Sequence, residues 1–422
     1  MIGLESHAAR RGLREDVVAL IEGNAVIGQS GGPTAVINQS LVGVVEGLRA
    51  RGGGSIRKVL GMRHGVRGFT HDDLVDLTET PQDLLDRVAN SPSAGLGSTR
   101  DKPDAAYCAR IFEACERHDV RYFFYIGGND SSDTCRIVNE LSNERGYELR
   151  CFHVPKTVDN DLPINDHTPG FPSAARFVAT ACRADALDNA SIPGIKINVI
   201  MGRHAGFLTA ASALARDGAD TGPHLIYVPE VAFDLDRFVH DVASVYDRLG
   251  RCQIAVSEGI QDKDGQSIGA MLIQGEVDAH GNVQLSGSGA LGDQLANVLK
   301  ARLTPDGGKP PRVRADTFGY LQRCWPDASP VDQAEARASG RKAAEIATSG
   351  DLDGSIAIIR DSTPGPDERY ATSYRRIELR DVAAKTKHMD PAFMKGTNDV
   401  SDAFLHYARP LVGDLPPLCR LE

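Results

Sequence analysis

The chain has 422 residues, 41% of them hydrophobic and 25% charged, and carries a formal net charge of −10 at pH 7. This length suffices for two or three domains with a sizeable core. The acidic balance argues against a nucleic-acid-binding protein, and no apolar run reaches the ~18 residues that a membrane-spanning helix needs.

The eight cysteines show neither a CxxC pair nor the spacing of a zinc site. In a chain of this length they indicate reduced, mostly structural thiols. The N-terminal stretch MIGLESHAARRGLREDVVAL is charged and lacks the apolar centre of a secretory signal. We therefore expect a soluble, cytoplasmic protein with no nucleic-acid or membrane partner.

Along the chain, short apolar runs that end in glycine or polar turns alternate with helical patterns. Strand-first units of this kind are predicted at 25–50, 121–144, 151–163 and 195–217, with further short strands at 224–230 and 252–259. Strands that alternate with helices predict an α/β fold with parallel sheets. Ligands of such folds bind beyond the carboxyl ends of the strands, where these turns fall.

The first unit contains GQSGGPTAVINQS at 28–40, with consecutive glycines before a helix. Backbone N–H groups there can face an anion, although a strand–helix turn that binds nothing fits equally well. No GK[ST] follows the glycines, so this is not a Walker A loop.

The second unit contains YIGGNDSSDT at 125–134. Its glycines would let a backbone approach a ligand, but Asp130 stands at the mouth of the turn. Because phosphate ligands are anionic, Asp130 should repel one unless a cation intervenes.

The third unit contains PKTVDNDLP at 155–163, which gathers Lys156, Asp159 and Asp161 in one turn. A hydrated acidic turn or helix cap is the plain alternative. The functional interpretation is a carboxylate that takes a proton from a hydroxyl as it attacks phosphorus. The second carboxylate would raise the first one's affinity for a proton or share that proton with it, and the lysine would neutralise the charge of the migrating phosphoryl group.

Later strands end in MGRHAG (201–206) and SEG (257–259), which place Arg203 and Glu258 at carboxyl ends. Arg203 could meet a phosphate or a carboxylate, or simply cover a helix end. Glu258 could bind a sugar hydroxyl. His204 is discounted, because a lone histidine is more often a structural hydrogen-bonding group.

Two further segments follow. GSGALG at 287–292 matches GxGxxG, but no ribose-binding acid follows, so a packing turn is preferred to a dinucleotide site. RADTFGYLQR at 314–323 brings together two arginines and a tyrosine, which suit a sugar phosphate. An exposed strand is the alternative.

Seven motifs occur in the same order as in the phosphofructokinase family, which the chain resembles over roughly residues 25–335: GQSGGPTAVIN, LGSTR, IGGND, PKTVDND, MGRHAG, SEG and RADTFGYLQR. The segments KTKHMD (385–390) and YARPLVG (407–413) resemble the tail of its pyrophosphate-using members.

The resemblance implies an α/β fold of two Rossmann-like, three-layer lobes with mostly parallel sheets and the active site in the cleft between them. The donor-binding lobe is expected at 1–170, with about 322–375 returning to it. The lobe that binds fructose 6-phosphate is expected at 171–321, together with 376–422.

The resemblance also implies the roles of single residues. Asp159 would be the general base for the 1-hydroxyl of the sugar, Arg100 would neutralise the transferring group, and Gly31 and Gly32 would face the donor. Arg314 would reach the site of a neighbouring subunit. The expected substrate contacts are Thr157, Val158, Asp159, Asp161, Met201, Gly202, Arg203, Glu258, Arg314, Tyr320 and Arg323.

Donor choice is implied by two residues. ATP-using members have small residues where this chain has Asp130 and Lys156. Asp130 would repel the α-phosphate of ATP, whereas Lys156 would hold and activate a compact pyrophosphate. These substitutions are typical of the pyrophosphate-dependent branch.

The metal and the subunit contact depart from the family pattern. Mg²⁺ is expected at Asn129, Asp130 and Asp159, but Asn129 stands where many members have an aspartate, which binds the ion more strongly. Where relatives bring an arginine across a subunit boundary, this chain has Gly194, with Lys196 nearby.

The implied activity is a Mg²⁺-dependent, reversible transfer of phosphoryl from pyrophosphate (diphosphate) to fructose 6-phosphate, in glycolysis or gluconeogenesis, by a homodimer or homotetramer. Two alternatives stay open. The first is an ATP-dependent 6-phosphofructokinase, which small residues at 130 and 156 would favour. The second is a non-catalytic sugar-phosphate sensor, which is supported by Asn129 in place of a metal-binding aspartate.

Overall fold

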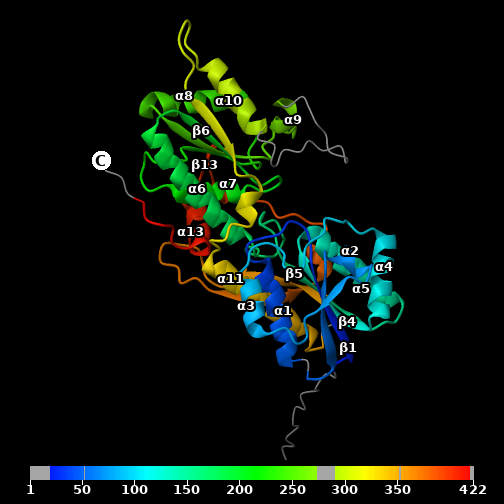
Figure 1. Cartoon of the computed structure of the whole chain (residues 1–422). Coiled ribbons are helices and arrows are strands. Elements are labelled where there is room, and N and C mark those ends of the chain that lie inside the picture. The colour runs from blue at the N-terminus through cyan, green and yellow to red at the C-terminus, as the bar shows by residue number, and fades with distance from the viewer. Residues whose placement is uncertain (1–19, 52, 273–289, 351–352, 419–422) are drawn as a thin grey trace, which may run out of the picture.

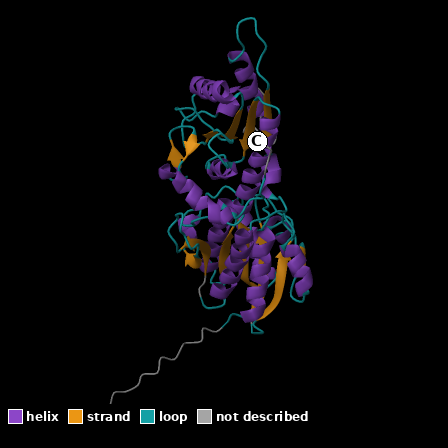
Figure 2. Cartoon of the chain, turned by 90° about the vertical axis from the view of Figure 1, so that its left-hand side faces the viewer, coloured by secondary structure: helices purple, strands orange, loops and turns teal. Residues whose placement is uncertain are grey.

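The computed structural model describes residues 20–51, 53–272, 290–350 and 353–418. Two sheets, each covered by helices on both faces, form two lobes that lie one above the other in Figure 1 and again in the turned view of Figure 2. In the described part of the chain, no helix is long and apolar enough to cross a membrane.

The larger sheet has seven strands in the order β11-β10-β5-β4-β1-β2-β3. Its inner pairs are parallel, and only the two edge strands, β3 and β11, pair antiparallel. The strands are β1 (Gly23–Gln29), β2 (Ile56–Met62), β3 (Leu74–Asp76), β4 (Val120–Gly127), β5 (Arg150–Pro155), β10 (Asp353–Arg360) and β11 (Thr372–Ile377).

Helices cover both faces of this sheet because its strands are apolar on both sides. Along β4, Phe124 and Ile126 enter one core and Phe123 and Tyr125 the opposite one. The first face carries α1 (Ile37–Arg51), α3 (Gln82–Ala89) and α11 (Pro330–Ala347), and the second α2 (Val66–Phe69), α4 (Ala105–Arg117), α5 (Asn129–Glu144) and α12 (Leu379–Val382).

The smaller sheet has four parallel strands in the order β7-β8-β6-β9: β7 (Leu225–Tyr227), β8 (Cys252–Ser257), β6 (Ile195–Ile200) and β9 (Val313–Thr317). One face packs on α8 (Leu235–Leu249) and α10 (Ala290–Arg302), the other on α6 (Phe171–Ser191), α7 (Phe207–Ala211) and α13 (Asp402–Val412). Shorter elements are α9 (Ile268–Leu272), the 3₁₀ turns η1 (Ser212–Ala215), η2 (Gly319–Arg323) and η3 (Pro391–Phe393), and the hairpin of β12 (Met394–Lys395) and β13 (Asp399–Val400).

The predicted fold class is confirmed: both lobes are three-layer α/β units with mostly parallel sheets. The hairpin of β10 and β11 returns to the larger sheet after the chain has built the smaller one, and β11 forms one edge of that sheet. The exact domain limits near residues 170 and 322 stay a prediction.

Two other expectations concern particular residues. Seven cysteines lie in the described part of the chain; all are unpaired, and all but Cys324 are buried. The first three residues of GSGALG lie outside the described residues, and the helix predicted after it is α10.

Candidate active site

The predicted loops of both lobes meet at the carboxyl ends of their strands. The turn after β1 lies against the turn after β9, since a Cβ atom added to Gly32 would stand 2.5 Å from Nη1 of Arg323. The turn after β5 joins them through Lys156. A phosphate donor and a sugar can therefore be approached from opposite lobes at one place.

Lys156 is buried on the glycine turn. Its ammonium group donates a hydrogen bond of 2.8 Å to the carbonyl oxygen of Gly32, and a Cβ atom on Gly31 would lie 3.1 Å from the same nitrogen. Burial lowers the pKa of Lys156 to about 8, although the carboxylate of Asp159 opposes the shift. The cation is thus held in a desolvated place beside a turn that lacks side chains.

The first glycine of the turn, Gly31, uses its backbone N–H within the protein. Gly31 has a left-handed φ of 75° and donates its N–H to the carbonyl oxygen of Thr99 across 2.9 Å. That amide is therefore engaged within the protein, which the sequence did not predict.

Asp159, Asn160 and Asp161 form a turn, called the DND turn below, which holds Asp159 near Lys156. The backbone N–H of Asp159 donates to Oγ1 of Thr157 across 3.1 Å, and Asn160 takes a left-handed φ of 59°. Burial and the charge of Asp161 raise the pKa of Asp159 to about 6, against the opposing effect of Lys156. A carboxylate with such a pKa is suited to accept a proton near neutral pH.

Asn129 and Asp130 begin α5 and point to different surroundings. Nδ2 of Asn129 lies 3.4 Å from Oδ2 of Asp161, while its buried Oδ1 has no hydrogen-bond partner within the described residues. Asp130 is exposed and forms an ion pair of 3.3 Å with Lys102.

This arrangement fits Mg²⁺ held together with substrate. The described residues contain no cluster of three or more His, Cys, Asp or Glu that could hold a metal alone. Mg²⁺ usually takes one or two protein oxygens and fills its shell with water and phosphate. The unpartnered oxygen of Asn129 and the neighbouring carboxylate of Asp161 are donors of that kind.

The smaller lobe contributes Glu258 and the MGR turn. Gly202 has a φ of 135° and its carbonyl oxygen accepts a hydrogen bond of 2.5 Å from Oγ of Ser257. Glu258 is buried next to this turn. Burial raises its pKa to about 7, opposed by Arg203 and reinforced by Asp159.

Arg323 stands between the two lobes. Its guanidinium lies 4.2 Å from the ring centre of Tyr320, and its buried Nε has no hydrogen-bond partner within the described residues. Burial and the charge of Arg100 lower its pKa. Arg323, which is predicted to bind the sugar phosphate, therefore also borders the glycine turn at Gly32.

Two predicted residues are not brought into this cluster. Arg314 pairs in register with Lys196, at the amino end of β6, whereas Met201 follows the carboxyl end of the same strand. Val158 is a buried member of the core under α6. Lys196 does not reach the site either, because it is buried in ion pairs with Asp185 and Asp188.

Sequence reasoning missed three residues that hold the site. Oε1 of Gln322 accepts a hydrogen bond of 3.4 Å from the backbone N–H of Met201. Lys387 and Tyr407 contact the DND turn from the C-terminal segment. The motifs KTKHMD and YARPLVG contained the signal, but no role was assigned to them.

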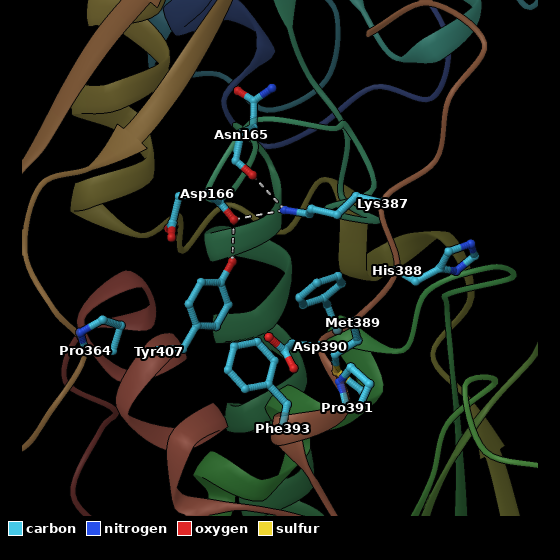
Figure 3. A pocket seen from close by; sticks show the side chains of 11 residues that line it. Asn165, Asp166, Pro364, Lys387, His388, Met389, Asp390, Pro391, Phe393 and Tyr407 are labelled. Atoms are coloured by element: carbon cyan, nitrogen blue, oxygen red, sulfur yellow. Dashed lines mark hydrogen bonds between the residues drawn. The ribbon is translucent and has the colours of Figure 1, made fainter. Parts of the chain in front are cut away.

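A cavity of about 580 Å³ lies beside Lys387 and Tyr407, which both contact Asn160 (Figure 3). Lys387, Tyr407, Asp166 and Phe393 are among its lining residues, and none of the predicted site residues is. The cavity is thus separate from the cluster of Lys156 and Asp159.

Comparison with known proteins gives consistent matches. Residues 24–347 match the family described as Phosphofructokinase. The chain is 52% identical over 407 residues to pyrophosphate–fructose 6-phosphate 1-phosphotransferase of Rhodospirillum rubrum, covering 96% of this chain and 98% of that protein. It is 39% identical to the protein of the same name from Halomonas elongata, covering 93% of each.

Among solved structures, the pyrophosphate-dependent phosphofructokinase from Nitrosospira multiformis is similar with a TM-score of 0.80 and 33% identity. The match covers 94% of each chain.

Proposed function

The chain belongs to the phosphofructokinase family, and we propose from this premise that it transfers a phosphoryl group from pyrophosphate to the 1-hydroxyl of fructose 6-phosphate. The products are fructose 1,6-bisphosphate and phosphate. Relatives that cover nearly the whole chain bear a name for this reaction.

One observation carries the choice of donor. Lys156 is only 4% exposed, and its ammonium group lies on the Gly31–Gly32 turn. Asp159 follows three residues after this lysine. A fixed positive charge in a desolvated place stabilises charge that develops on a transferring phosphoryl group. A compact pyrophosphate needs such a charge close to the glycine turn.

The protein's part in the reaction is a proton transfer together with charge neutralisation. Asp159 accepts the proton of the 1-hydroxyl while that oxygen attacks one phosphorus of pyrophosphate. The bond from this phosphorus to the bridging oxygen breaks, and phosphate leaves with the electron pair. Lys156 and Arg100 neutralise the charge on the phosphoryl oxygens, and the protein supplies mainly position and electrostatics.

Asn129 Oδ1 and Asp161 would hold Mg²⁺ in this site, while Asp130 is exposed and paired with Lys102 and the expected part of Asp159 stays a prediction. When bound, the ion would screen the charge between the two phosphates of the donor. The chain's own contribution is to hold these oxygens next to the general base.

Exclusion of a nucleotide is assigned to Asp130. The N-terminus of a helix attracts phosphate through its free N–H groups and its dipole. Asp130 adds its own negative charge to the first turn of α5, and its ion pair with Lys102 offsets part of that charge. A phosphate that approached this helix end would meet a carboxylate.

The sugar phosphate is assigned to Arg203, Glu258 and Tyr320 on the smaller lobe and to Arg323, which stands between the lobes. Arg314 is exposed and apart from them in the same chain, so its role requires a second copy of the chain. We therefore propose a homodimer or homotetramer in the cytoplasm, with Arg314 serving the neighbouring subunit.

The test is whether fructose 1,6-bisphosphate forms from fructose 6-phosphate and pyrophosphate in the presence of Mg²⁺, measured in a coupled assay. The reverse reaction from fructose 1,6-bisphosphate and phosphate should also proceed. A sugar-phosphate sensor would instead bind fructose 6-phosphate without turnover, and titration calorimetry separates it from an inactive preparation.

A further inference from the structure

The turn that carries the general base contains a residue in a costly conformation. Asn160 has a φ of 59° and is fully buried between Asp159 and Asp161. Left-handed backbone is uncommon for residues other than glycine and persists where the surroundings hold it. The side chain of Asn160 shows what holds it.

Tyr407 on α13 contacts the amide of Asn160. Nδ2 of Asn160 donates to the hydroxyl of Tyr407 across 2.8 Å, and that hydroxyl donates to the carbonyl oxygen of Asp166 across 2.9 Å. The ring of Tyr407 packs against Phe171 and Phe393 with centroid distances of 6.5 and 5.2 Å. A ring fixed in this way gives its hydroxyl a defined place.

Lys387 holds the same turn from the other side. Its Nζ lies 3.4 Å from Oδ1 of Asn160 and donates to the carbonyl oxygens of Asn165 and Asp166, each at 2.9 Å. Its backbone N–H donates to the carbonyl oxygen of Asp161 across 2.7 Å. Figure 3 shows Lys387 and Tyr407 converging on Asp166 from the C-terminal segment.

We propose that Tyr407 is a positioning residue for the general base: through Asn160 it holds the DND turn so that Asp159 points at the acceptor hydroxyl. Lys387 supports the same turn through its main chain and side chain. The tail that follows the smaller sheet thus orients a group more than 200 residues earlier in the chain. This inference rests on the proposed function.

The hydroxyl of Tyr407 can act on catalysis without touching substrate. Without the hydrogen bond from Asn160 to Tyr407, the turn samples other orientations of Asp159. A misplacement of about 1 Å can cost ~100-fold in rate. The sugar phosphate is assigned to Arg203, Glu258, Tyr320 and Arg323, none of which lies on this turn, so the KM for fructose 6-phosphate should change much less than kcat.

The experiment uses Tyr407→Phe, which keeps the packed ring and removes only the hydroxyl. We expect kcat with pyrophosphate to fall ~10- to 100-fold, with the KM for fructose 6-phosphate within about twofold of wild type. Tyr147→Phe is the matched control, since its hydroxyl bonds the Val120 carbonyl oxygen at 2.9 Å, away from the turn.

A second variant covers the case in which Tyr407→Phe fails to fold. Asn160→Gly accepts the left-handed conformation without strain but loses the anchor, so the same loss of kcat is expected from a folded protein. Unchanged kcat in either folded variant, beside an active wild type, overturns this inference alone. An inactive wild type overturns it together with the proposed function.

Discussion

The ammonium group of Lys156 is fixed 2.8 Å from the carbonyl oxygen of Gly32, so a side chain of the turn after β5 closes over the glycine turn after β1. The lysine is buried, and burial lowers its pKa to about 8. A cation in this position supplies the charge that a small anion beside the glycine turn needs. The choice of donor should therefore change with this residue.

Removing the two donor-selecting side chains should shift the donor. Lys156→Gly alone should lower kcat/KM for pyrophosphate by roughly 100-fold or more, the size expected for one lost electrostatic contact. Asp130→Gly with Lys156→Gly should in addition make turnover with ATP measurable. Lys58→Met, which removes an exposed lysine paired with Asp76, serves as the control. Full pyrophosphate turnover in the double variant would falsify the roles given to both residues.

The pH dependence of kcat/KM should be bell-shaped. The rate should fall below about pH 6, where Asp159 becomes protonated and cannot accept a proton. It should fall again above about pH 8, where Lys156 loses its charge. Initial rates from pH 5 to 9.5 check this, and Lys156→Arg should remove the alkaline limb while keeping the acid one. An alkaline limb unchanged in that variant would contradict the assignment.

A buried ionic cluster beside the site should make stability depend on pH. Burial alone would lower the pKa of His167, but Glu335 and Asp166 outweigh it and raise the pKa to about 9. Because the folded pKa is above the unfolded one, the stabilisation is complete below about pH 6.5 and is lost as pH rises through about 9. Its upper bound is between about 3 and 4 kcal/mol, at about 1.4 kcal/mol per pKa unit.

The check is the free energy of unfolding of wild type and His167→Gln between pH 6 and 9.5. The variant should be less stable at pH 6, and the difference should shrink toward pH 9.5. Taking the difference cancels the opposite trend of the buried lysines, whose pKa values are lowered. A difference that stays constant with pH would show that His167 is not charged in the folded protein.

Arg314 should act across a subunit boundary. Arg314→Ala and Arg323→Ala should each be nearly inactive as pure proteins. Mixing them by denaturation and refolding should restore activity, because a hybrid contains one site with both arginines intact. Activity is compared with that of each variant refolded alone. No recovery in hybrids of proven composition would place Arg314 outside the shared site.

The sequence predicted those parts of the fold that depend on local pattern. The apolar strands, the glycine turns and the helices after them lie where β1, β4, β5 and β6 were expected, because each unit is read within about 30 residues. The cluster of Lys156, Asp159 and Asp161 was recognised because its members are neighbours in the chain. The resemblance to the family supplied their roles.

Contacts between distant segments could not be predicted in this way. Glu335 reaches His167 across 168 residues, and Tyr407 reaches Asn160 across 247. No single stretch reveals such pairs, since they depend on how α11 and α13 pack on the turn after β5. The separation of Arg314 from Arg323 follows from strand register, which places Arg314 near the amino end of β9.

The most direct measurement is the rate of fructose 1,6-bisphosphate formation from fructose 6-phosphate and Mg²⁺, with pyrophosphate as donor in one assay and ATP in a parallel one. The account predicts turnover with pyrophosphate and none with ATP. Turnover with ATP alone would keep the family and contradict the roles of Lys156 and Asp130. No turnover with either donor, from folded protein that binds fructose 6-phosphate, would contradict the proposed activity itself.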